Sequence, residues 1–241
     1  MMKYLIDTHF HLDHYKNYME IAETINSLQQ YTIAVTNSPG VFLSCKNIFP
    51  ENDFLKFAIG FHPQETQLSS VDLNDFIKLI SRTNYVGEVG LDYSKKTFME
   101  PAFQKECFDK IVECCASKNK VVSIHIRKAE EDAIHILEKY KPKKAIIHWY
   151  TGSEEHLRKL LELNCYFSIN SNMVSGKNAE KYYLIPRERI LIESDGPYTK
   201  VNGKKYTPKL LVGVYSNIAL FYNDKDLIKH VYENFKRLLV L

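Results

Sequence analysis

The sequence has little of what marks secreted, membrane-spanning or disulfide-rich proteins. Its five cysteines are odd in number and form no C-x-x-C pair, which speaks against a disulfide framework or a cysteine-based zinc site. No apolar run approaches the roughly 20 residues that span a bilayer. The opening segment, MMKYLIDTHFH, has too short an apolar stretch for a secretory signal. We therefore expect a cytoplasmic protein with reduced thiols and no membrane segment.

An excess of charge of one sign is also missing. The 32 basic and 29 acidic residues leave a formal net charge of +3, which neither requires nor excludes a nucleic acid partner. No low-complexity tract or Gly/Ser linker divides the 241 residues. Because 45% of the residues are hydrophobic and 25% charged, we predict one globular domain over residues 1–241.

Short apolar runs alternate with longer amphipathic segments along the whole chain. The eight runs, rich in Val and Ile, are expected to be buried strands at residues 4–7, 32–36, 57–60, 85–89, 121–125, 145–148, 165–169 and 190–193. Helical spacing of apolar residues predicts helices at 19–30, 71–81, 101–118, 130–140, 153–163, 209–221 and 225–238. Residues 195–208 form the longest irregular stretch, and a loop of that length is often functional.

This β/α alternation predicts an α/β fold with parallel strands, namely a single (β/α)8 TIM barrel. An open doubly wound sheet is the alternative. It is less favoured because no glycine-rich phosphate turn follows the first strand, which instead ends in histidines.

The first predicted strand runs into a pair of histidines. Because alternate strand residues share a face, Asp7, His9 and His11 can point into one space. An H-x-H pair suits two imidazoles that reach one metal from a single strand end, although a surface or capping pair would look the same.

Carboxylates and further histidines stand where other apolar runs stop. Glu88 lies between valines and glycines, where an unpaired carboxylate would be unfavourable to bury. A cation would stabilise it, and so would a buried basic partner. His62, His125, His148, Glu193 and Asp195 each end a run. Taken singly, a turn residue before proline or a hydrogen-bonded core histidine explains each histidine equally well.

The combined pattern is more specific than any single residue. Five of the nine histidines fall at predicted strand ends, and the strand C-termini of a β/α barrel meet on the face that carries active sites. Four imidazoles with two carboxylates there predict a metal site, with two divalent ions. Mixed imidazole and carboxylate ligands suit Zn²⁺, Mn²⁺ or Fe²⁺ better than Mg²⁺.

Six motifs resemble the TatD family of metal-dependent deoxyribonucleases, in the family's order and across almost the whole chain. The resemblance implies a barrel of the metal-dependent hydrolase (amidohydrolase-like) type. They are D-T-H-x-H-L-D at residues 7–13, G-x-H-P at 60–63, G-E-V-G-L-D at 87–92, H-x-R at 125–127, H-x-Y-T-G-S at 148–153 and E-S-D-G-P at 193–197. Finer details, such as S-I-H-x-R and H-W-Y-T-G-S, look closer to the TatD-like component of Qat anti-phage defence systems. That likeness implies partner proteins of a defence system.

The resemblance also implies roles for individual residues. One metal would be held by His9, His11 and Asp195, and Glu88 would bridge to a second metal held by His125 and His148. His62 would lie near the scissile phosphate, and Asp7 and Glu193 would orient ligands. The family brings in Mg²⁺ as a further candidate metal.

These roles suggest a mechanism. A water between the two cations would ionise to a metal-bound hydroxide near neutral pH, with Asp195 taking its proton, so we count Asp195, Glu88 and His62 as catalytic.

Substrate contacts are less clear, because the family's Arg-Asn-x-Pro-like segment is replaced here by Y-T-K-V-N-G-K-K-Y-T-P at residues 198–208. We expect Arg127, Lys200, Lys204 and Lys205 to hold phosphate oxygens, although the lysines could equally form a solvated loop. Rings just past strand ends could stack on bases of single-stranded or frayed DNA, or could only pack the barrel mouth: Phe61, Tyr93, Trp149 and Tyr150.

The preferred function is therefore metal-dependent hydrolysis of phosphodiester bonds in DNA, as an exonuclease. Two alternatives stay open. One is hydrolysis of a small ester, lactone or amide by the same metals, which would need a closed pocket instead of a cationic groove. The other is a catalytically silent subunit, against which the complete set of ligands speaks.

Overall fold

The computed structural model describes residues 4–50, 52–95 and 97–241. The described chain falls into two compact units. The first unit combines residues within 1–34 and 50–56 with residues 167–241, and the second unit combines residues 35–49 with 57–166. The prediction of one domain over residues 1–241 stays a prediction.

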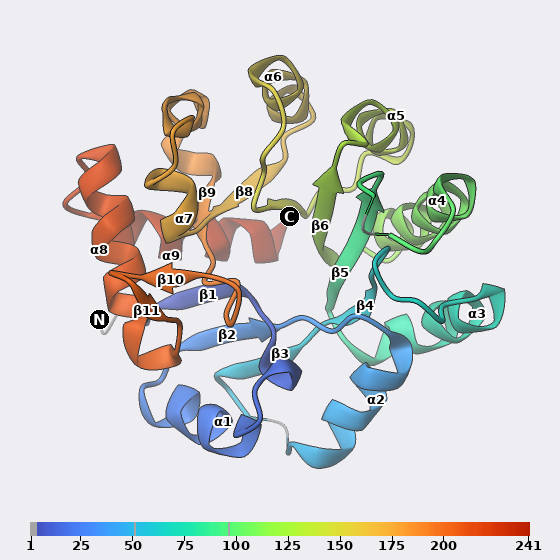
Figure 1. The fold of residues 1–241 in the computed structure, drawn as a ribbon, viewed down its shortest axis with the longest axis horizontal. Helices are drawn as coiled ribbons and strands as arrows, with labels where there is room; N and C mark the ends of the chain where they lie inside the picture. The colour runs from blue at the N-terminus through green and yellow to red at the C-terminus, as the bar shows by residue number, and fades with distance from the viewer. Residues whose placement is uncertain (1–3, 51, 96) are drawn as a thin grey trace. The chain divides into compact units, whose positions relative to one another are not determined.

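The first unit contains two sets of neighbouring strands. β1 (Ile6–Phe10), β2 (Tyr31–Ala34) and β3 (Leu55–Phe57) lie in that order, and β1 and β2 are parallel (Figure 1). β8 (Tyr166–Ile169) is parallel to β9 (Ile190–Ile192). A short antiparallel hairpin follows, made of β10 (Lys200–Val201) and β11 (Lys204–Lys205). The α-helices are α1 (Tyr18–Ser27), α7 (Ser171–Val174), α8 (Leu211–Tyr222) and α9 (Leu227–Val240), with 3-10 turns at Leu12–His14, Ala179–Leu184, Arg187–Arg189 and Pro208–Leu210.

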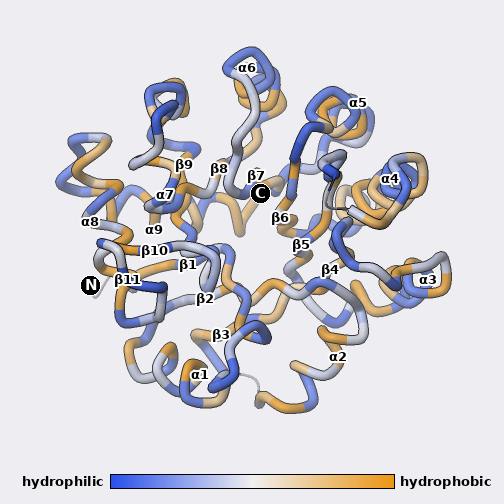
Figure 2. The backbone as a smooth tube through the Cα atoms, in the orientation of Figure 1, coloured by the Kyte–Doolittle hydropathy of each residue, from blue (hydrophilic) through white to orange (hydrophobic). Residues whose placement is uncertain are grey.

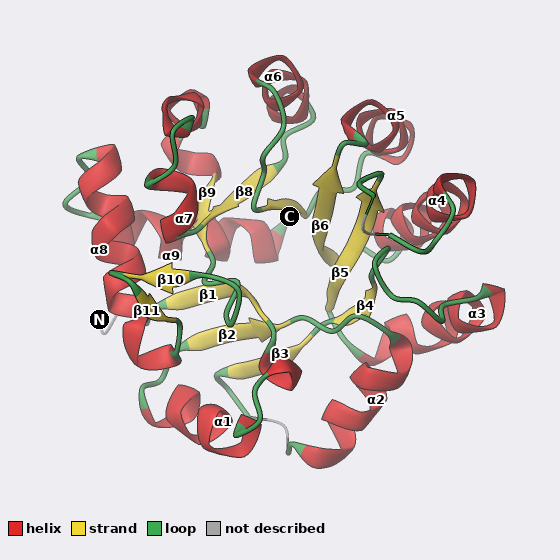
Figure 3. Cartoon of the chain, in the orientation of Figure 1, coloured by secondary structure: helices red, strands yellow, loops and turns green. Residues whose placement is uncertain are grey.

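The second unit is a regular series of strands and helices (Figure 3). Its parallel strands lie in the order β4 (Ile59–Phe61), β5 (Tyr85–Asp92), β6 (Val121–Arg127) and β7 (Ala145–His148). The helices are α2 (Pro39–Ile48), α3 (Ser70–Leu79), α4 (Pro101–Ser117), α5 (Glu130–Tyr140) and α6 (Glu154–Glu162), with a 3-10 turn at Ile80–Arg82. A helix crossover between consecutive strands is what parallel pairing requires.

The core of the second unit explains why its strands read as continuous apolar runs. All eight residues of β5 are buried, as expected for a parallel strand covered on both faces. Val89, Ile124 and Ile147 are completely inaccessible to solvent. Each such side chain contributes about 1.5–3 kcal/mol relative to leaving it exposed. Hydrophobic and hydrophilic residues alternate around the helical turns in Figure 2, so the helices can cover this core with one face.

Local signals place several helix ends where the sequence predicts them. α5 spans the predicted residues, and α6 begins after Ser153, whose hydroxyl accepts a hydrogen bond from the His156 N–H at 3.2 Å. Among the described residues, no helix combines the length and the apolar character that crossing a bilayer would need.

Some predicted elements need correction. The run at 57–60 is not one strand, because β3 ends at Phe57 and β4 begins at Ile59 in a different sheet. α2 was not predicted, since its opening Pro39-Gly40 reads as a turn, although Ser38 caps it and proline is favoured in a first helical turn. The stretch 195–208 is not wholly irregular, because it contains the β10–β11 hairpin around an Asn202-Gly203 turn.

Candidate functional site

Three of the expected metal ligands lie together in the first unit. His9 Nε2 is 3.3 Å from His11 Nε2, and the Asp195 Oδ1 atom is 3.3 Å from His11 Nε2 and 3.8 Å from His9 Nε2. All three side chains are buried. Metal bonds of 2.0–2.2 Å in tetrahedral geometry separate ligand atoms by about 3.4 Å, so these atoms fit one cation.

The backbone joins the two histidines to Asp195 directly. The Asp195 N–H donates to the His9 carbonyl at 2.9 Å, and the His11 N–H donates to the Gly196 carbonyl at 3.0 Å. Asp195 itself has φ of 47°, a left-handed conformation that aspartate tolerates better than most residues. Gly196 must be glycine, because a Cβ there would lie 2.3 Å from the Tyr206 ring.

A bulge in β1 sets the direction of His9. Asp7 pairs with Thr32 and Phe10 pairs with Ala34, so β1 advances three residues while β2 advances two. The extra residue falls at Thr8–His9. Bulges beside active sites commonly redirect a side chain in this way.

The carboxylate of Asp195 supplies the strongest sign of a cation. Its Oδ1 atom faces the two imidazoles, is buried, and accepts no hydrogen bond within the described part of the chain. A buried carboxylate oxygen without a donor is strongly unfavourable. A bound cation would remove that penalty, so the donor set fits a metal.

Asp7 and Glu193, expected to orient ligands, are both anchored in the first unit. Asp7 Oδ1 accepts hydrogen bonds from the backbone of Ser194 at 2.9 Å and of His9 at 3.3 Å, and burial raises the pKa of Asp7 to about 7. The Tyr206 hydroxyl donates to Asp7 Oδ2 at 3.2 Å. Asp7 therefore supports the backbone of the cluster and not an imidazole ring.

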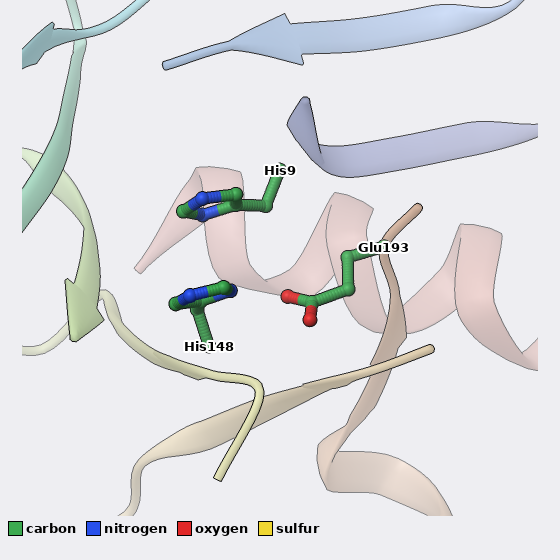
Figure 4. Close-up of side chains that lie close together, drawn as sticks. All are labelled: His9, His148 and Glu193. Atoms are coloured by element: carbon green, nitrogen blue, oxygen red, sulfur yellow. The ribbon is translucent and has the colours of Figure 1, made fainter. Parts of the chain in front are cut away.

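The Glu193 carboxylate is held by side chains from the end of β8. Asn170 Nδ2 donates to Glu193 Oε1 at 2.8 Å, and the Ser168 hydroxyl donates to the other carboxylate oxygen. A Glu193 oxygen and a His9 ring nitrogen lie within 4.8 Å of each other. Both side chains are labelled in Figure 4.

The second unit brings three histidines to one carboxylate oxygen. Glu88 Oε1 is 2.8 Å from His125 Nδ1, 3.0 Å from His62 Nε2 and 3.4 Å from His148 Nε2. His148 is the last residue of β7 and is labelled in Figure 4. Glu88 is buried at 3% exposure, so no solvent replaces these contacts. The three partners of Glu88 Oε1 seen among the described residues are thus histidine nitrogens.

A second bulge sets the direction of Glu88. Val86 pairs with Val122 and Val89 with Ile124, so β5 carries one residue more than β6 at Gly87–Glu88. Close packing follows at Gly90, which has φ of 150° and where a Cβ would lie 1.9 Å from the His125 carbonyl oxygen. Only glycine allows β6 to bring His125 this near.

The outer nitrogen of His125 contacts a second carboxylate, to which the sequence analysis assigned no role. His125 Nε2 lies 3.2 Å from Asp92 Oδ2, and Asp92 also accepts hydrogen bonds from Gln64 Nε2 and the Ser94 N–H. Burial alone would raise the pKa of Asp92, but the hydrogen bonds from His125, Ser94 and Gln64 hold it well below its usual range. Burial likewise lowers the pKa of His125, and its hydrogen bonds to Asp92 and Glu88 raise it by more.

This arrangement turns His125 Nδ1 toward the site. A carboxylate on the outer nitrogen of a ligand histidine fixes the ring and its tautomer in many metal proteins. The signal for Asp92 was in the sequence, four residues after Glu88 in the same motif.

His62 differs from the other two histidines around Glu88. The Gln64 N–H donates to His62 Nδ1 at 3.1 Å, which leaves the ring proton of the neutral imidazole on Nε2. His62 Nε2 therefore donates to Glu88 Oε1. A protonated nitrogen suits a hydrogen-bond donor and not a metal ligand.

The predicted substrate contacts divide into exposed and buried residues. Arg127 and the three hairpin lysines are exposed, and Trp149 is half-buried. The Tyr93 hydroxyl is engaged with Asp132 at 2.8 Å. The prediction that Phe61 and Tyr150 stack on bases is wrong, because both rings are buried. Phe61 packs edge-on against Phe76, and the Tyr150 hydroxyl donates to the Ser153 carbonyl.

Buried clusters of histidine and carboxylate at the ends of parallel strands define the class of metal-dependent hydrolases on an α/β barrel. A family model described as TatD related DNase matches residues 6–240, and the chain belongs to this family.

Individual relatives are consistent with this family assignment. The chain is 28% identical to the uncharacterized metal-dependent hydrolase YcfH of Escherichia coli K12, over 98% of this chain and 95% of YcfH. It is 34% identical to deoxyribonuclease Tat-D of Schizosaccharomyces pombe, over 48% of this chain and 38% of that protein. It is 28% identical to the human 3'-5' RNA nuclease TATDN2, over 80% of this chain and 28% of that protein.

The crystal structure of YJJV, a TatD homologue from Escherichia coli K12, superposes with a TM-score of 0.87 at 18% identity, covering 99% of this chain and 98% of YJJV. This likeness and the parallel β/α order confirm the predicted fold class, a (β/α)8 barrel.

Proposed function

We propose that this protein is a metal-dependent phosphodiester hydrolase that degrades DNA as an exonuclease. The observation that carries the proposal is Asp195 Oδ1, a buried carboxylate oxygen that faces two imidazoles and accepts no hydrogen bond within the described residues. The names of Tat-D and TATDN2 support a nuclease, and they leave the choice between DNA and RNA to experiment.

Two divalent cations would be held, one by each cluster. His9, His11 and Asp195 would hold the first, and Glu88, His125 and His148 the second. Such ions supply charge neutralisation on the phosphodiester and lower the pKa of water. Zn²⁺, Mn²⁺ and Fe²⁺ match the imidazole-rich donors better than Mg²⁺. The expected bridging by Glu88 stays a prediction.

The protein's own residues would divide the remaining work. Asp195 would take the proton of the attacking water on its carboxylate. His62 would donate its Nε2 proton to a phosphate oxygen in place of Glu88 Oε1, which would then bind the cation. Arg127 and the lysines Lys200, Lys204 and Lys205 are exposed and would hold neighbouring phosphates.

Cleavage and metal content measured on the same sample test this proposal. End-labelled single-stranded DNA, double-stranded DNA and RNA of one sequence would be incubated with the protein, with and without EDTA. His125→Ala is the test variant, and His135→Ala, an exposed histidine of α5, is the matched control. We expect metal-dependent cleavage from one end that is abolished by EDTA and by His125→Ala, and retained by His135→Ala.

Other results would contradict the proposal in different ways. Bound metal without cleavage of any nucleic acid would refute the nuclease and redirect the search to small esters, lactones or amides. Protein that carries no metal and binds none on titration would favour a catalytically silent subunit.

A finer part of the proposal concerns biological context. We propose that the chain acts with partner proteins in an anti-phage defence system of the Qat type. This rests only on the motif details S-I-H-x-R and H-W-Y-T-G-S. Co-purification with products of neighbouring genes, and loss of phage protection in the Asp195→Asn variant, would test it.

A further inference from the structure

One aromatic side chain beside the first cluster is left in solvent. Tyr198 is 57% exposed, although it follows Asp195 by only three residues and its N–H donates to the Asp195 carbonyl at 2.9 Å. Two other tyrosines of the same region, Tyr15 and Tyr206, are buried at 9% and 1% exposure. Packing of the loop therefore uses those two rings and does not require that of Tyr198.

Tyr198 is nevertheless held firmly in place. Its hydroxyl lies 2.6 Å from His14 Nδ1, and its ring meets the rings of His11 and His14 edge-on at centroid distances of 5.4 and 5.6 Å. The His14 ring in turn stacks on that of His11 at 4.8 Å with an interplanar angle of 6°. An exposed aromatic ring is thus fixed against a proposed metal ligand.

The chain immediately after Tyr198 is basic. Lys200 and Lys205 are cross-strand partners in the β10–β11 hairpin, and Lys204 is also exposed. Like charges directly opposite each other in a hairpin are destabilising. Within the described ranges none of the three lysines forms an ion pair, so no acidic side chain relieves this repulsion. A polyanion would relieve it.

We propose that Tyr198 and the β10–β11 hairpin form a platform for single-stranded nucleic acid. The Tyr198 ring stacks on the base of the nucleotide at the cleaved phosphodiester, and the hairpin lysines bind the phosphates beyond it. An exposed ring followed by cations is the usual arrangement for binding single strands without sequence preference. His14 acts as a positioning residue, because it holds the hydroxyl of Tyr198.

The platform rests on the proposed nuclease function and gives it a substrate preference. A base in a duplex is stacked on both neighbours and offers no face to a ring. An unpaired base has a free face on which the Tyr198 ring can stack. We therefore infer preference for single-stranded or frayed ends, carried by the Tyr198 ring and not by its hydroxyl.

Kinetics with matched variants test the platform. Tyr198→Ala, Tyr198→Phe and the control Tyr183→Ala, which removes another tyrosine of 58% exposure in the first unit, would be compared on single-stranded DNA. A second substrate lacks the base at the position of cleavage. We expect Tyr198→Ala to raise KM by about 5- to 100-fold with little change in kcat, as loss of one stacked base predicts. Tyr198→Phe keeps the ring and should raise KM much less than Tyr198→Ala does, and Tyr183→Ala should stay near wild type, with unchanged metal content in all variants.

The abasic substrate provides a measurement that needs no variant. For wild type, KM should rise on the abasic substrate by the same factor by which Tyr198→Ala raises it on the intact strand. Wild type and Tyr198→Ala should therefore have equal KM values on the abasic substrate. Equal KM values for wild type and Tyr198→Ala on the intact strand would overturn the platform. So would a loss in Tyr198→Phe as large as that in Tyr198→Ala, because the ring would then not be the determinant.

A binding experiment separates this proposal from the nuclease itself. EDTA-treated protein would be titrated into a single-stranded oligonucleotide that carries 2-aminopurine, whose fluorescence is quenched by stacking. Quenching by wild type and Tyr198→Phe, but not by Tyr198→Ala, would support the platform even if no cleavage were found. Cleavage by wild type with no quenching difference between variants would overturn the platform and leave the nuclease standing.

Discussion

The central carboxylates of the two histidine–carboxylate clusters, Asp195 and Glu88, differ in their hydrogen-bond partners. In the first unit, Asp195 Oδ1 faces His9 and His11 but accepts no hydrogen bond within the described residues. In the second unit, Glu88 Oε1 has three imidazole nitrogens between 2.8 and 3.4 Å, and Nε2 of His62 donates to it. The first carboxylate therefore depends on a cation, whereas the second already receives a hydrogen bond from His62.

The supports behind the clusters differ as well. Backbone N–H groups of His9 and Ser194 hold Asp7, and backbone hydrogen bonds join the two histidines to the turn at Asp195. Behind the second cluster, the side chains of Gln64 and His125 meet at Asp92. The first cluster is fixed mainly by the course of the chain and the second by a network of side chains. Substitutions of side chains should therefore affect the two differently.

Asp195→Asn should give the largest effect. Asparagine keeps the left-handed backbone and the volume but removes the charge that holds a cation and accepts a proton. We expect turnover to fall by about 100- to 10,000-fold with an unchanged circular dichroism spectrum. Asp226→Asn, at an exposed aspartate before α9, is the control and should be neutral. Full activity of Asp195→Asn would refute the assigned site.

In the metal-free protein, substitutions in the two clusters should change the thermal midpoint in opposite directions. In EDTA, Asp195→Asn removes a buried carboxylate whose Oδ1 atom accepts no hydrogen bond within the described residues, and it should raise the thermal midpoint above that of EDTA-treated wild type. Glu88→Gln removes a carboxylate paired with three histidines and should lower it. Each change should correspond to about 1–3 kcal/mol in the free energy of unfolding. Calorimetry that finds the same sign for both variants would break the comparison.

Asp92→Asn should weaken only the cluster of the second unit. Losing the carboxylate behind a ligand histidine typically reduces metal affinity or activity by about 10- to 100-fold. Metal titration should show one weakened class of site and one unchanged class. If the affinity for all bound metal fell equally, the two clusters would not have separate supporting residues.

Tyr206→Phe should give the smallest effect. It deletes one hydroxyl that donates to Asp7 Oδ2 at 3.2 Å and leaves a buried ring of the same shape. One neutral hydrogen bond contributes about 0.5–1.5 kcal/mol, so we expect turnover to fall only about 2- to 10-fold. Tyr15→Phe, which removes a hydroxyl bonded to the Tyr206 carbonyl, tests whether the loop and not Asp7 is responsible. A larger loss in Tyr15→Phe would point to the loop.

Much of this molecule could be read from local pattern. Apolar runs located the strands to within a few residues because parallel strands are buried on both faces, and Ser153 marked the start of α6. The first strand was placed too early, at residues 4–7 instead of Ile6–Phe10, because its buried histidines look polar in sequence. The break between β3 and β4 was missed because one apolar run continues through it.

The sequence also identified the candidate metal ligands, but it did not determine where their side chains point. Histidine and carboxylate types at strand ends are a chemical signal that needs no coordinates. Which way His9 and Glu88 point depends on bulges at Thr8–His9 and Gly87–Glu88, and a bulge exists only relative to the partner strand. The same reason applies to Phe61 and Tyr150, whose burial depends on what packs against them.

By itself, then, the sequence determined the kinds of elements, their order and the chemical groups available for a metal, because these follow from side-chain type and spacing along one chain. Only the tertiary structure decided which groups meet. His11 and Gly196 are far apart in sequence yet share a backbone hydrogen bond, and Asp92 reaches His125 across two strands. Such contacts arise from strand register and close packing at Gly90 and Gly196, which are properties of pairs of segments and not of any one of them.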